Sequence, residues 1–257
     1  MMNIIEVSEL TKYYPASEHP ALDRVSFTVL PGSFTTILGR SGSGKTTLFR
    51  CLNLLLRPTT GIIRIWEQDW LSLEAHELCE ARRQMATIFQ QFNLINRLSV
   101  IENVLAGQLS NIPFWRVLVR RFPPMYEDWA LHCLERVGLQ DLADRPAGQL
   151  SGGQQQRVAI ARALAQRSRI ILADEPVASL DTESSHIVLD ELRSISVTDG
   201  ITILCSLHQE DLALQYGDHI IGLREGRVAV AVPREEFTAE HRMQIYQTPD
   251  ETTPHSQ

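Results

Sequence analysis

The chain has 257 residues, 44% of them hydrophobic, which is enough for one large domain with a buried core and makes a disordered or fibrous class improbable. Its formal net charge of −7 provides no global field toward nucleic acid or an anionic bilayer. Cysteines 51, 79, 133 and 205 are scattered without a CxxC pair, which predicts reduced thiols and indicates neither a zinc site nor a disulfide framework. No apolar run approaches the roughly 18 residues of a membrane span, and "MMNIIEV" lacks a basic region followed by an apolar one, so we expect a soluble, cytoplasmic protein.

Two short strands and an apolar-rich loop are expected in residues 1 to 32, followed by a buried strand, "SFTTIL", over 33–38. The next stretch, "GRSGSGKTT", leads into a helix over "TTLFRCLNLLL". Gly39, Gly42, Gly44, Lys45 and Thr46 match G-x-x-x-x-G-K-[ST]. Glycines let backbone N–H groups converge on phosphate oxygens, a helix N-terminus attracts anions, the lysine reaches the outer phosphates and the threonine hydroxyl suits Mg²⁺. The loop therefore predicts a nucleoside triphosphate site.

Residues 91 to 150 are predicted to be mostly helical, with "VIENVLAGQL" and "YEDWALHCLERVG" as the clearest segments. Between them, "IPFWRVLVRRFPPMY" over 112–126 mixes aromatic residues with three arginines. Two interpretations stay open for it. It is either an amphipathic helix ended by Pro123 or part of a groove that receives a loop of a membrane subunit.

A Ser-Gly-Gly turn opens the next predicted helix, "LSGGQQQRVAIARALAQ", over residues 150 to 166. Its N-terminus is a second glycine-exposed site suited to phosphate. One nucleotide does not need two such cradles from one chain. The turn is therefore either a glycine-tolerant helix cap or a site for a nucleotide held by another copy.

Two carboxylates follow the apolar strand "RIILADEP", at the end where open α/β sheets place ligands. Asp174 is predicted to face the metal, and Glu175, which points the other way, to polarise the attacking water; the alternative is a solvated strand end. A further strand, "ITILCSL", precedes His208, which alone indicates a helix cap or surface residue, with Ser206 and Gln209 as a possible capping box. The end, "QTPDETTPHSQ", is expected to be a disordered tail.

One ordered set runs through these motifs: Gly39 to Thr46, Gln90, Leu150 to Gln154, Asp174 with Glu175, Asp181 and His208. With this set, nearly the whole chain resembles the nucleotide-binding subunit of an ATP-binding cassette (ABC) transporter. The resemblance implies an α/β fold of the P-loop NTPase type, with a RecA-like parallel-sheet core, an N-terminal antiparallel β subdomain and an inserted α-helical subdomain. A single cassette would span residues 1–246, with a core over 1–90 and 151–232, a helical subdomain over about 91–150, a C-terminal segment over 233–246 and a tail over 247–257.

The resemblance also implies roles for individual residues, with ATP and Mg²⁺ as cofactors. Lys45, Gln90, Glu175 and His208 would be catalytic, and Thr46, Gln90 and Asp174 would hold the metal. In a head-to-tail dimer, one copy would contact ATP through Tyr14, Gly39, Arg40, Ser41, Gly42, Ser43, Gly44, Lys45, Thr46 and Thr47, and the other through Ser151, Gly152, Gly153 and Gln154. Ser179 and Asp181 would lie at the dimer interface. Tyr13 competes with Tyr14 for adenine, and Gln91 could be confused with Gln90.

Four stretches together resemble the ATPase of bacterial phosphonate importers: "FQQFNLINRLSVIENVLAG", "PFWR", "QLSGGQQQRVAIARAL" and "DGITILCSLHQEDLALQYGDHIIGLREGRV". This resemblance implies membrane permease partners, an indirect solute-binding protein, and a peripheral location on the cytoplasmic face of the inner membrane. The cargo would be a phosphonate, with phosphite or phosphate esters as alternatives. One rival is an accessory cassette of phosphonate breakdown that assembles with a soluble lyase. Another is a cassette that acts on DNA or the ribosome, which the acidic charge and the short insertion oppose, so no nucleic-acid partner is expected.

Overall fold

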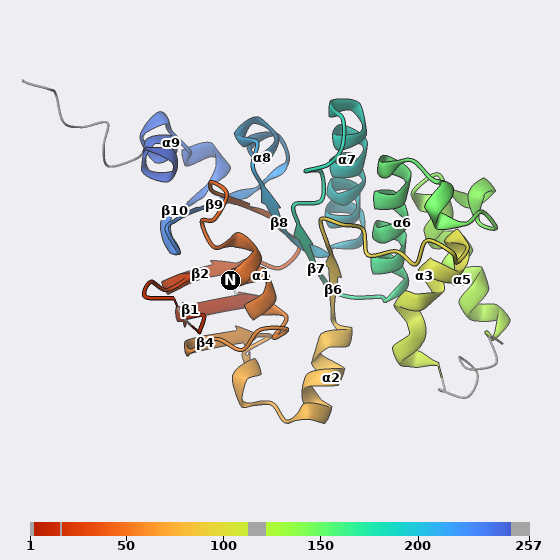
Figure 1. The fold of residues 1–257 in the computed structure, drawn as a ribbon, viewed down its shortest axis with the longest axis horizontal. Coiled ribbons are helices and arrows are strands. Elements are labelled where there is room, and N and C mark those ends of the chain that lie inside the picture. Colours follow the sequence, from red (N-terminus) through yellow and green to blue (C-terminus); the bar gives the residue numbers. More distant parts are fainter. Residues whose placement is uncertain (1–2, 16, 113–121, 248–257) are drawn as a thin grey trace, which may run out of the picture. The chain divides into compact units, whose positions relative to one another are not determined.

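The computed structural model describes residues 3–15, 17–112 and 122–247. The chain divides into two compact units, and Figure 1 shows the elements of both. Unit 1 comprises residues 1–72 and 206–257, and unit 2 comprises residues 73–205. The predicted boundaries between core and helical subdomain are not tested by this division and stay a prediction.

The antiparallel sheet of unit 1 has the strand order β2-β1-β4-β5. Its strands are β1 (Ile5–Lys12), β2 (Leu22–Val29), β4 (Thr60–Ile65) and β5 (Gln68–Asp69), followed by the short 3₁₀ helix η1 (Trp70–Ser72). Along the second half of β2, Val25, Phe27 and Val29 are buried while the residues between them are exposed. This alternation is typical of an antiparallel strand with one face against a core.

Unit 1 also contains a parallel strand pair, β3 (Phe34–Leu38) and β9 (His219–Arg224), and β10 (Arg227–Pro233) lies antiparallel to β9. All five residues of β3 are buried, as expected for a strand covered on both faces. Helix α1 (Lys45–Leu52) follows β3, α8 (Glu210–Tyr216) contacts β3, and α9 (Ala239–Tyr246), which follows η5 (Arg234–Glu236), contacts β9 and β10. The predicted strand before the glycine loop and the helix after it are confirmed.

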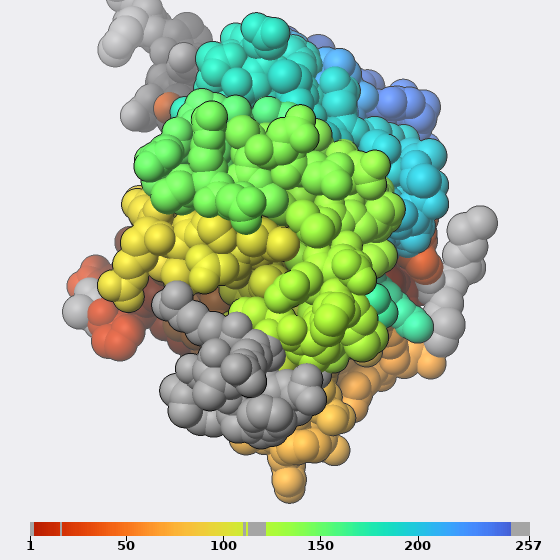
Figure 2. All heavy atoms as spheres, turned by 90° about the vertical axis from the view of Figure 1, so that its right-hand side faces the viewer, coloured from red at the N-terminus to blue at the C-terminus, as the bar shows by residue number. Residues whose placement is uncertain are grey.

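Unit 2 begins with α2 (Ala75–Arg83) and β6 (Met85–Ile88), which pairs in parallel with β7 (Ile170–Asp174). A group of mutually contacting helices contains α3 (Val100–Leu105), α5 (Pro124–Arg136) and α6 (Gly152–Ala165). The 3₁₀ helices η2 (Ala106–Asn111), η3 (Gln140–Leu142) and η4 (Ala147–Gln149) connect them. Figure 2 faces these helices, coloured yellow to green. Helix α7 (Thr182–Asp199) leads to β8 (Thr202–Leu207), whose last two residues belong to unit 1.

Strands and helices therefore alternate along most of the chain, and the α/β fold with parallel pairs and a separate antiparallel sheet is confirmed. Two predictions fall where the structure gives no description: most of the segment over 112–126 and almost all of the tail. Of the former, α5 begins directly after Pro123, at Pro124, a position where proline fits a helix start. No helix of the described residues is both long and apolar enough to cross a membrane.

All four cysteines are free, as predicted, and Cys79 is exposed while the other three are buried. Burial raises the pKa of the Cys51 thiol to about 11 and that of Cys133 to about 12. These two thiols therefore stay protonated at neutral pH and act as small apolar core groups.

The carboxyl group of Glu191 in α7 lies where burial disfavours its charged form. Burial raises its pKa from 4.5 to about 8, with Arg157 opposing this shift and Asp190 adding to it. Its Oε2 atom is buried and has no hydrogen-bond partner among the described residues. Between these two pH values the folded chain holds a proton that the unfolded chain has released, so the free energy of unfolding falls as the pH rises.

We expect Glu191→Gln to remove this dependence, because the amide does not titrate. The stability of the wild type relative to the variant should decrease by about 1 to 3 kcal/mol between pH 5 and pH 8, allowing for partial solvent screening. Urea unfolding of both proteins at several pH values measures this difference. Parallel stability profiles for the two proteins would show that Glu191 is not the titrating group.

Candidate functional site

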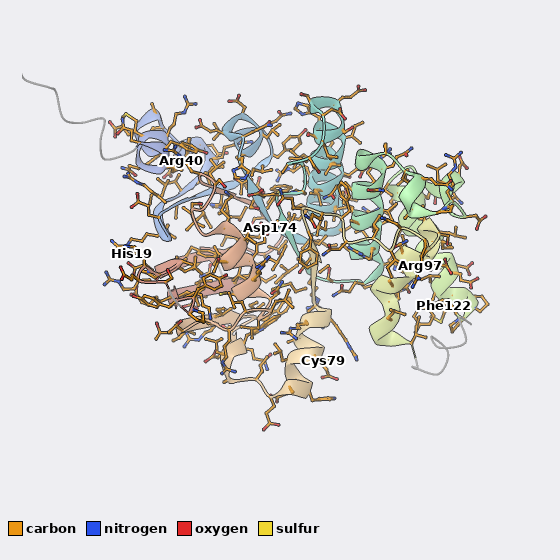
Figure 3. All side chains as sticks on the ribbon, in the orientation of Figure 1. His19, Arg40, Cys79, Arg97, Phe122 and Asp174 are labelled. Atoms are coloured by element: carbon orange, nitrogen blue, oxygen red, sulfur yellow. The ribbon has the colours of Figure 1, made fainter. Side chains whose placement is uncertain are left out.

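The glycine loop joins β3 to α1 in unit 1 and is shaped by backbone conformations that side chains oppose. Gly44, the N-cap residue of α1, has φ 105°, and a Cβ there would lie 2.6 Å from the carbonyl oxygen of Ala21. Gly42 has φ 79° and open space beside it. Arg40, labelled in Figure 3, and Ser41 are exposed. The loop thus presents bare backbone at a helix N-terminus, where N–H groups attract phosphate.

Lys45 is buried at the first position of α1. Its Nζ atom donates hydrogen bonds to the carbonyl oxygens of Gly39 at 2.8 Å and Arg40 at 3.3 Å. The same atom lies 3.4 Å from Nδ1 of His208, which is exposed directly after β8. The predicted lysine and histidine are therefore brought together at the loop. The Ser206 to Gln209 capping box is wrong, because Ser206 lies inside β8 and Gln209 caps α8 without a side-chain hydrogen bond.

Two further features of the loop fit a phosphate ligand. The Ser43 hydroxyl oxygen is buried and has no hydrogen-bond partner among the described residues. Thr46 and Thr47 lie partly exposed in the first turn of α1. A buried hydroxyl without a partner is costly, and a phosphate oxygen is a group that would satisfy it.

The turn between β9 and β10 is hydrogen-bonded to the glycine loop, a contact that the sequence did not predict. The Gly226 N–H donates to the Ser43 carbonyl oxygen at 3.0 Å, and its carbonyl oxygen accepts from Asp23 N–H at 2.8 Å. Arg227 Nε donates to the Asp23 carboxylate at 2.8 Å. These bonds, which we call the brace, connect the N-terminal sheet through the β9–β10 turn to the glycine loop. In the sequence, the letters "EGR" indicate a turn at this place but not its contact with the glycine loop.

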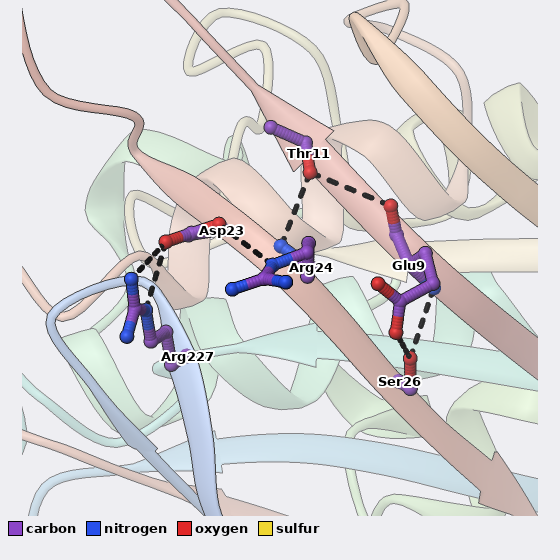
Figure 4. A network of polar contacts seen from close by, with 6 residues as sticks. All are labelled: Glu9, Thr11, Asp23, Arg24, Ser26 and Arg227. Atoms are coloured by element: carbon purple, nitrogen blue, oxygen red, sulfur yellow. Dashed lines mark hydrogen bonds and ion pairs between the residues drawn. The ribbon is translucent and has the colours of Figure 1, made fainter.

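Strands β1 and β2 are irregular beside these contacts, and Figure 4 shows the polar network of Glu9, Thr11, Asp23, Arg24, Ser26 and Arg227 there. The pairing of the two strands shifts register after Val7 and again after Leu10. Glu9 and Arg24 have positive φ angles of 49° and 48°. The Glu9 N–H donates to the Ser26 hydroxyl, and the Arg24 N–H to the Thr11 hydroxyl. Side chains thus replace ladder bonds at these bulges.

Tyr14, rather than Tyr13, reaches the helix that follows the glycine loop. Its hydroxyl lies 3.2 Å from the Thr47 hydroxyl, and the residue is 37% exposed. Tyr13 is 45% exposed, and its backbone N–H bonds Thr59 at the end of the antiparallel sheet. The contact favours Tyr14 over Tyr13 as a residue near a nucleotide in the loop.

In unit 2, Asp174 and Glu175 stand where β7 ends. Asp174 is the last residue of the strand and is buried, and Figure 3 labels it there. Glu175 is half-buried and has φ 50°, a left-handed conformation that few residues other than glycine adopt. The regular strand conformation therefore stops at Asp174. Backbone strain of this kind clusters at functional sites.

Gln90 is exposed in a tight turn just beyond β6. The Phe92 N–H donates to the Phe89 carbonyl oxygen at 3.2 Å, which leaves Gln90 and Gln91 at the centre of the turn. Both glutamines are exposed, so burial does not separate the predicted residue from its neighbour. Phe92 and Asn93 follow with positive φ angles of 52° and 50°.

The Ser-Gly-Gly turn is the N-terminus of α6. Ser151 is the N-cap residue, its hydroxyl accepts a bond from Gln154 N–H, and the Gln154 side chain accepts one from Ser151 N–H. This capping box confirms the helix start and gives both side chains a structural role. Other side chains lie close to Gly152 and Gly153. A Cβ on Gly152 would lie 3.3 Å from Leu180, and one on Gly153 would lie 2.9 Å from the Ser184 hydroxyl.

Asp181 caps α7 beside this turn. Its carboxylate accepts bonds from the backbone N–H of Ser184 at 2.9 Å and from the Ser184 hydroxyl at 2.7 Å. These bonds, the backbone one first, lower the pKa of Asp181. Ser179 is exposed in the preceding loop. The cap explains Asp181 in structural terms, and the role of both residues at a dimer interface stays a prediction.

No group of three or more His, Cys, Asp or Glu side chains in the described part of the chain is arranged to hold a metal ion by itself. The candidate Mg²⁺ ligands Thr46, Gln90 and Asp174 supply oxygen atoms only, which is the donor type that Mg²⁺ prefers. A few protein oxygens fit a Mg²⁺ ion that is held largely by phosphate and water.

Comparisons with known proteins agree with this arrangement. The family model described as ABC transporter matches residues 22–178. The phosphonates import ATP-binding protein PhnC 2 of Rhodopseudomonas palustris (strain BisA53) is 46% identical over 226 residues, 88% of this chain and 84% of that protein. The hypophosphite import ATP-binding protein HtxD of Stutzerimonas stutzeri is 45% identical over 228 residues, 89% of this chain and 67% of that protein.

Among solved structures, the dimeric post-hydrolysis state of the ATP-binding cassette MJ0796, bound to ADP and Pi, has a TM-score of 0.77 and 35% identity. It covers 91% of this chain, and the alignment covers 100% of that chain. The glycine loop, the strand-end carboxylates and this likeness define a nucleotide-binding cassette, and the chain belongs to the ABC transporter family. Within that family it is an ATP-binding subunit with ATPase activity.

If Tyr14 stacks on adenine, Tyr14→Ala should weaken ATP binding roughly three- to tenfold, the range expected for loss of one aromatic contact. Tyr14→Phe should bind nearly as the wild type does, because the ring is kept. Tyr13→Ala is the matched control and should change the dissociation constant less than about twofold. Calorimetric titration with ATP measures all three. An equal or larger loss in Tyr13→Ala would assign the adenine contact to Tyr13.

Proposed function

We propose that this chain is the ATP-hydrolysing subunit of an importer for phosphonates or closely related phosphorus oxyanions. The observation that carries the proposal is the 46% identity to a phosphonates import ATP-binding protein across 88% of the chain. The relative named for hypophosphite import, at 45% identity, extends the cargo class to other small phosphorus compounds. Nothing in a cassette contacts cargo, so the cargo is assigned by relationship alone.

The glycine loop would hold the triphosphate of ATP. Lys45 and the loop amides would neutralise the β and γ phosphates, and the Ser43 hydroxyl would gain an acceptor. Bound Mg²⁺ supplies positive charge that stabilises the transferring phosphoryl group. Thr46, Gln90 and Asp174 would hold it through oxygen atoms.

Glu175 would orient the attacking water and accept its proton as the bond to the γ phosphate forms. A carboxylate suits this role because it accepts hydrogen bonds from water, and the left-handed backbone at Glu175 is of a kind that clusters at functional sites. His208, which lies beside Lys45, would contact the γ phosphate and help to hold the water. Gln90 would respond to the nucleotide and pass that state to the membrane partner.

Hydrolysis would need two copies of the chain. The N-terminus of α6, with Ser151, Gly152, Gly153 and Gln154, would close over ATP in the glycine loop of a partner copy arranged head to tail. Support comes from the structurally similar cassette that is described as dimeric. Ser179 and Asp181, next to the Gly153 turn, would lie at the interface between copies. ATP would hold the dimer together, and its cleavage would release it.

The membrane permease would dock in a groove of unit 2. This groove has a volume of about 300 Å³, and its lining includes Cys79, Arg82, Arg83, Gly107, Arg162 and Gln166. Three arginines favour a docking segment that carries carboxylates. The complex would lie on the cytoplasmic face of the inner membrane, with a solute-binding protein on the opposite side. The segment over 112–126 remains a second predicted contact.

Stimulated ATPase activity tests the function. The chain, purified in lipid with the permease encoded beside it, should hydrolyse ATP several-fold faster when a solute-binding protein loaded with methylphosphonate is present than when the same protein is empty. Loading with hypophosphite and with phosphate gives the matched cargo controls. Co-purification with a soluble lyase in place of a permease, or equal rates with loaded and empty binding protein, would contradict the importer and favour an accessory role in phosphonate breakdown.

A further inference from the structure

Helix α6 holds the chain on both sides of strand β6 with two side chains one turn apart. At the start of the strand, Gln166 Nε2, which has two N–H donors, lies within hydrogen-bond distance of three carbonyl oxygens: those of Arg82 at 3.1 Å, Arg83 at 3.2 Å and Met85 at 3.1 Å. Beyond it, Arg162 donates to the carbonyl oxygens of Asn93 at 2.6 Å and Phe92 at 2.9 Å. The strand and the Gln90 turn therefore lie between two attachments to one helix.

The attachment through Arg162 falls on strained backbone. Phe92 and Asn93 both have left-handed φ angles, which asparagine tolerates but a bulky residue such as phenylalanine rarely adopts. The planar guanidinium offers several N–H donors in a fixed fork, so it can hold two neighbouring carbonyl oxygens at once. A lysine ammonium carries its three donors on one atom and lacks this fixed planar fork, so it matches the pair of carbonyl oxygens less well.

The position of Arg162 on α6 is itself fixed. A Cβ on Gly107 would lie 2.2 Å from the Arg162 carbonyl oxygen, so η2 packs directly on the helix backbone at this point. At the N-terminus of the same helix, a Cβ on Gly152 would lie 3.8 Å from Cζ of the Phe92 ring. The Phe92 segment thus lies against the start of α6 and is bonded to a side chain from its last turn. The Arg162 side chain also lines the groove that contains Cys79.

We propose that Arg162 is a positioning residue for ATP hydrolysis, which holds the Phe92–Asn93 turn so that Gln90 keeps one orientation relative to α6. We call the two bonds from Arg162 to Phe92 and Asn93 the clasp. Through the clasp, a partner seated in the groove and a nucleotide at the N-terminus of α6 would both act on the segment that contains Gln90. The proposal rests on the proposed function, because it assigns Gln90 its role there. It adds a residue that touches neither nucleotide nor water and acts through the backbone of its neighbours.

The variants Arg162→Gln and Arg162→Lys test the clasp, with Arg157→Gln as the matched control. Arg157 lies on the same helix, is also half-buried, and donates to the carbonyl oxygen of Val137 instead. The complex with permease and methylphosphonate-loaded binding protein is assayed for kcat and for the KM of ATP. Amide hydrogen exchange over residues 89–95 is measured on the isolated full-length chain.

We expect Arg162→Gln to lower stimulated kcat by on the order of tenfold or more, with the KM for ATP within about threefold of the wild type. Exchange over 89–95 should rise in this variant. Arg162→Lys should recover part of kcat, because one carbonyl oxygen regains a charged donor. Arg157→Gln should reduce thermal stability while keeping kcat within about twofold and exchange over 89–95 unchanged.

Wild-type kcat in Arg162→Gln, an equal kcat loss in Arg157→Gln, or unchanged exchange over 89–95 would each overturn the proposal. Wild-type stimulation by the loaded binding protein is measured first. If that stimulation is missing, the proposed importer function fails, whereas the exchange comparison on the isolated chain still decides whether Arg162 holds the turn.

Discussion

The site depends on one constraint: a buried parallel strand must end where the chain can become polar and change direction. Every residue of β3, β7 and β8 is buried, whereas Glu175 directly after β7 is half-buried and His208 directly after β8 is exposed. Gly39, Glu175 and His208 stand at these three exits. Because parallel strands put their carboxyl ends on one side of a sheet, ligand sites of α/β proteins form at such exits. In unit 1 the exits carry the glycine loop and His208, and in unit 2 the exit of β7 carries Asp174 and Glu175.

The strand exits were predictable from the sequence because apolar runs ended in short motifs with a known chemical purpose. The same holds for the start of α6, where Ser151 and Gln154 form the capping box that their spacing allows. The error at Ser206 has the same origin. The capping-box spacing occurs there by chance, because Ser206 is a buried residue of β8 and does not start a helix.

The supports of the site were not predictable, because they join residues that are distant in sequence. The bond from Arg227 to Asp23 spans 204 positions, and the bonds from Arg162 to Asn93 and Phe92 span 69 and 70. The left-handed angles at Glu175 and Phe92 have no sequence signature, because neither residue type favours that conformation; only Asn93 is of a type that often adopts it. Such strain is visible only once the surrounding contacts that maintain it are known.

Helix α6 connects these features within unit 2. It begins at the turn assigned to a partner's nucleotide, holds the Gln90 segment through Arg162, and ends at Gln166 beside the entrance to β6. A rigid helix with attachments at several points moves as one body, so a displacement at its N-terminus would reach Gln90 and the groove together. The proposed coupling between ATP and a membrane partner would use this helix.

The most direct test of the account is turnover and mass of Glu175→Gln with ATP and Mg²⁺, with Glu183→Gln in the exposed first turn of α7 as the control. The account predicts that Glu175→Gln binds ATP, accumulates as a dimer in light scattering, and hydrolyses ATP at about one hundredth of the wild-type rate or below. Glu183→Gln should behave as the wild type does. Near-normal turnover by a monomeric Glu175→Gln protein would contradict both the assigned base and the shared site.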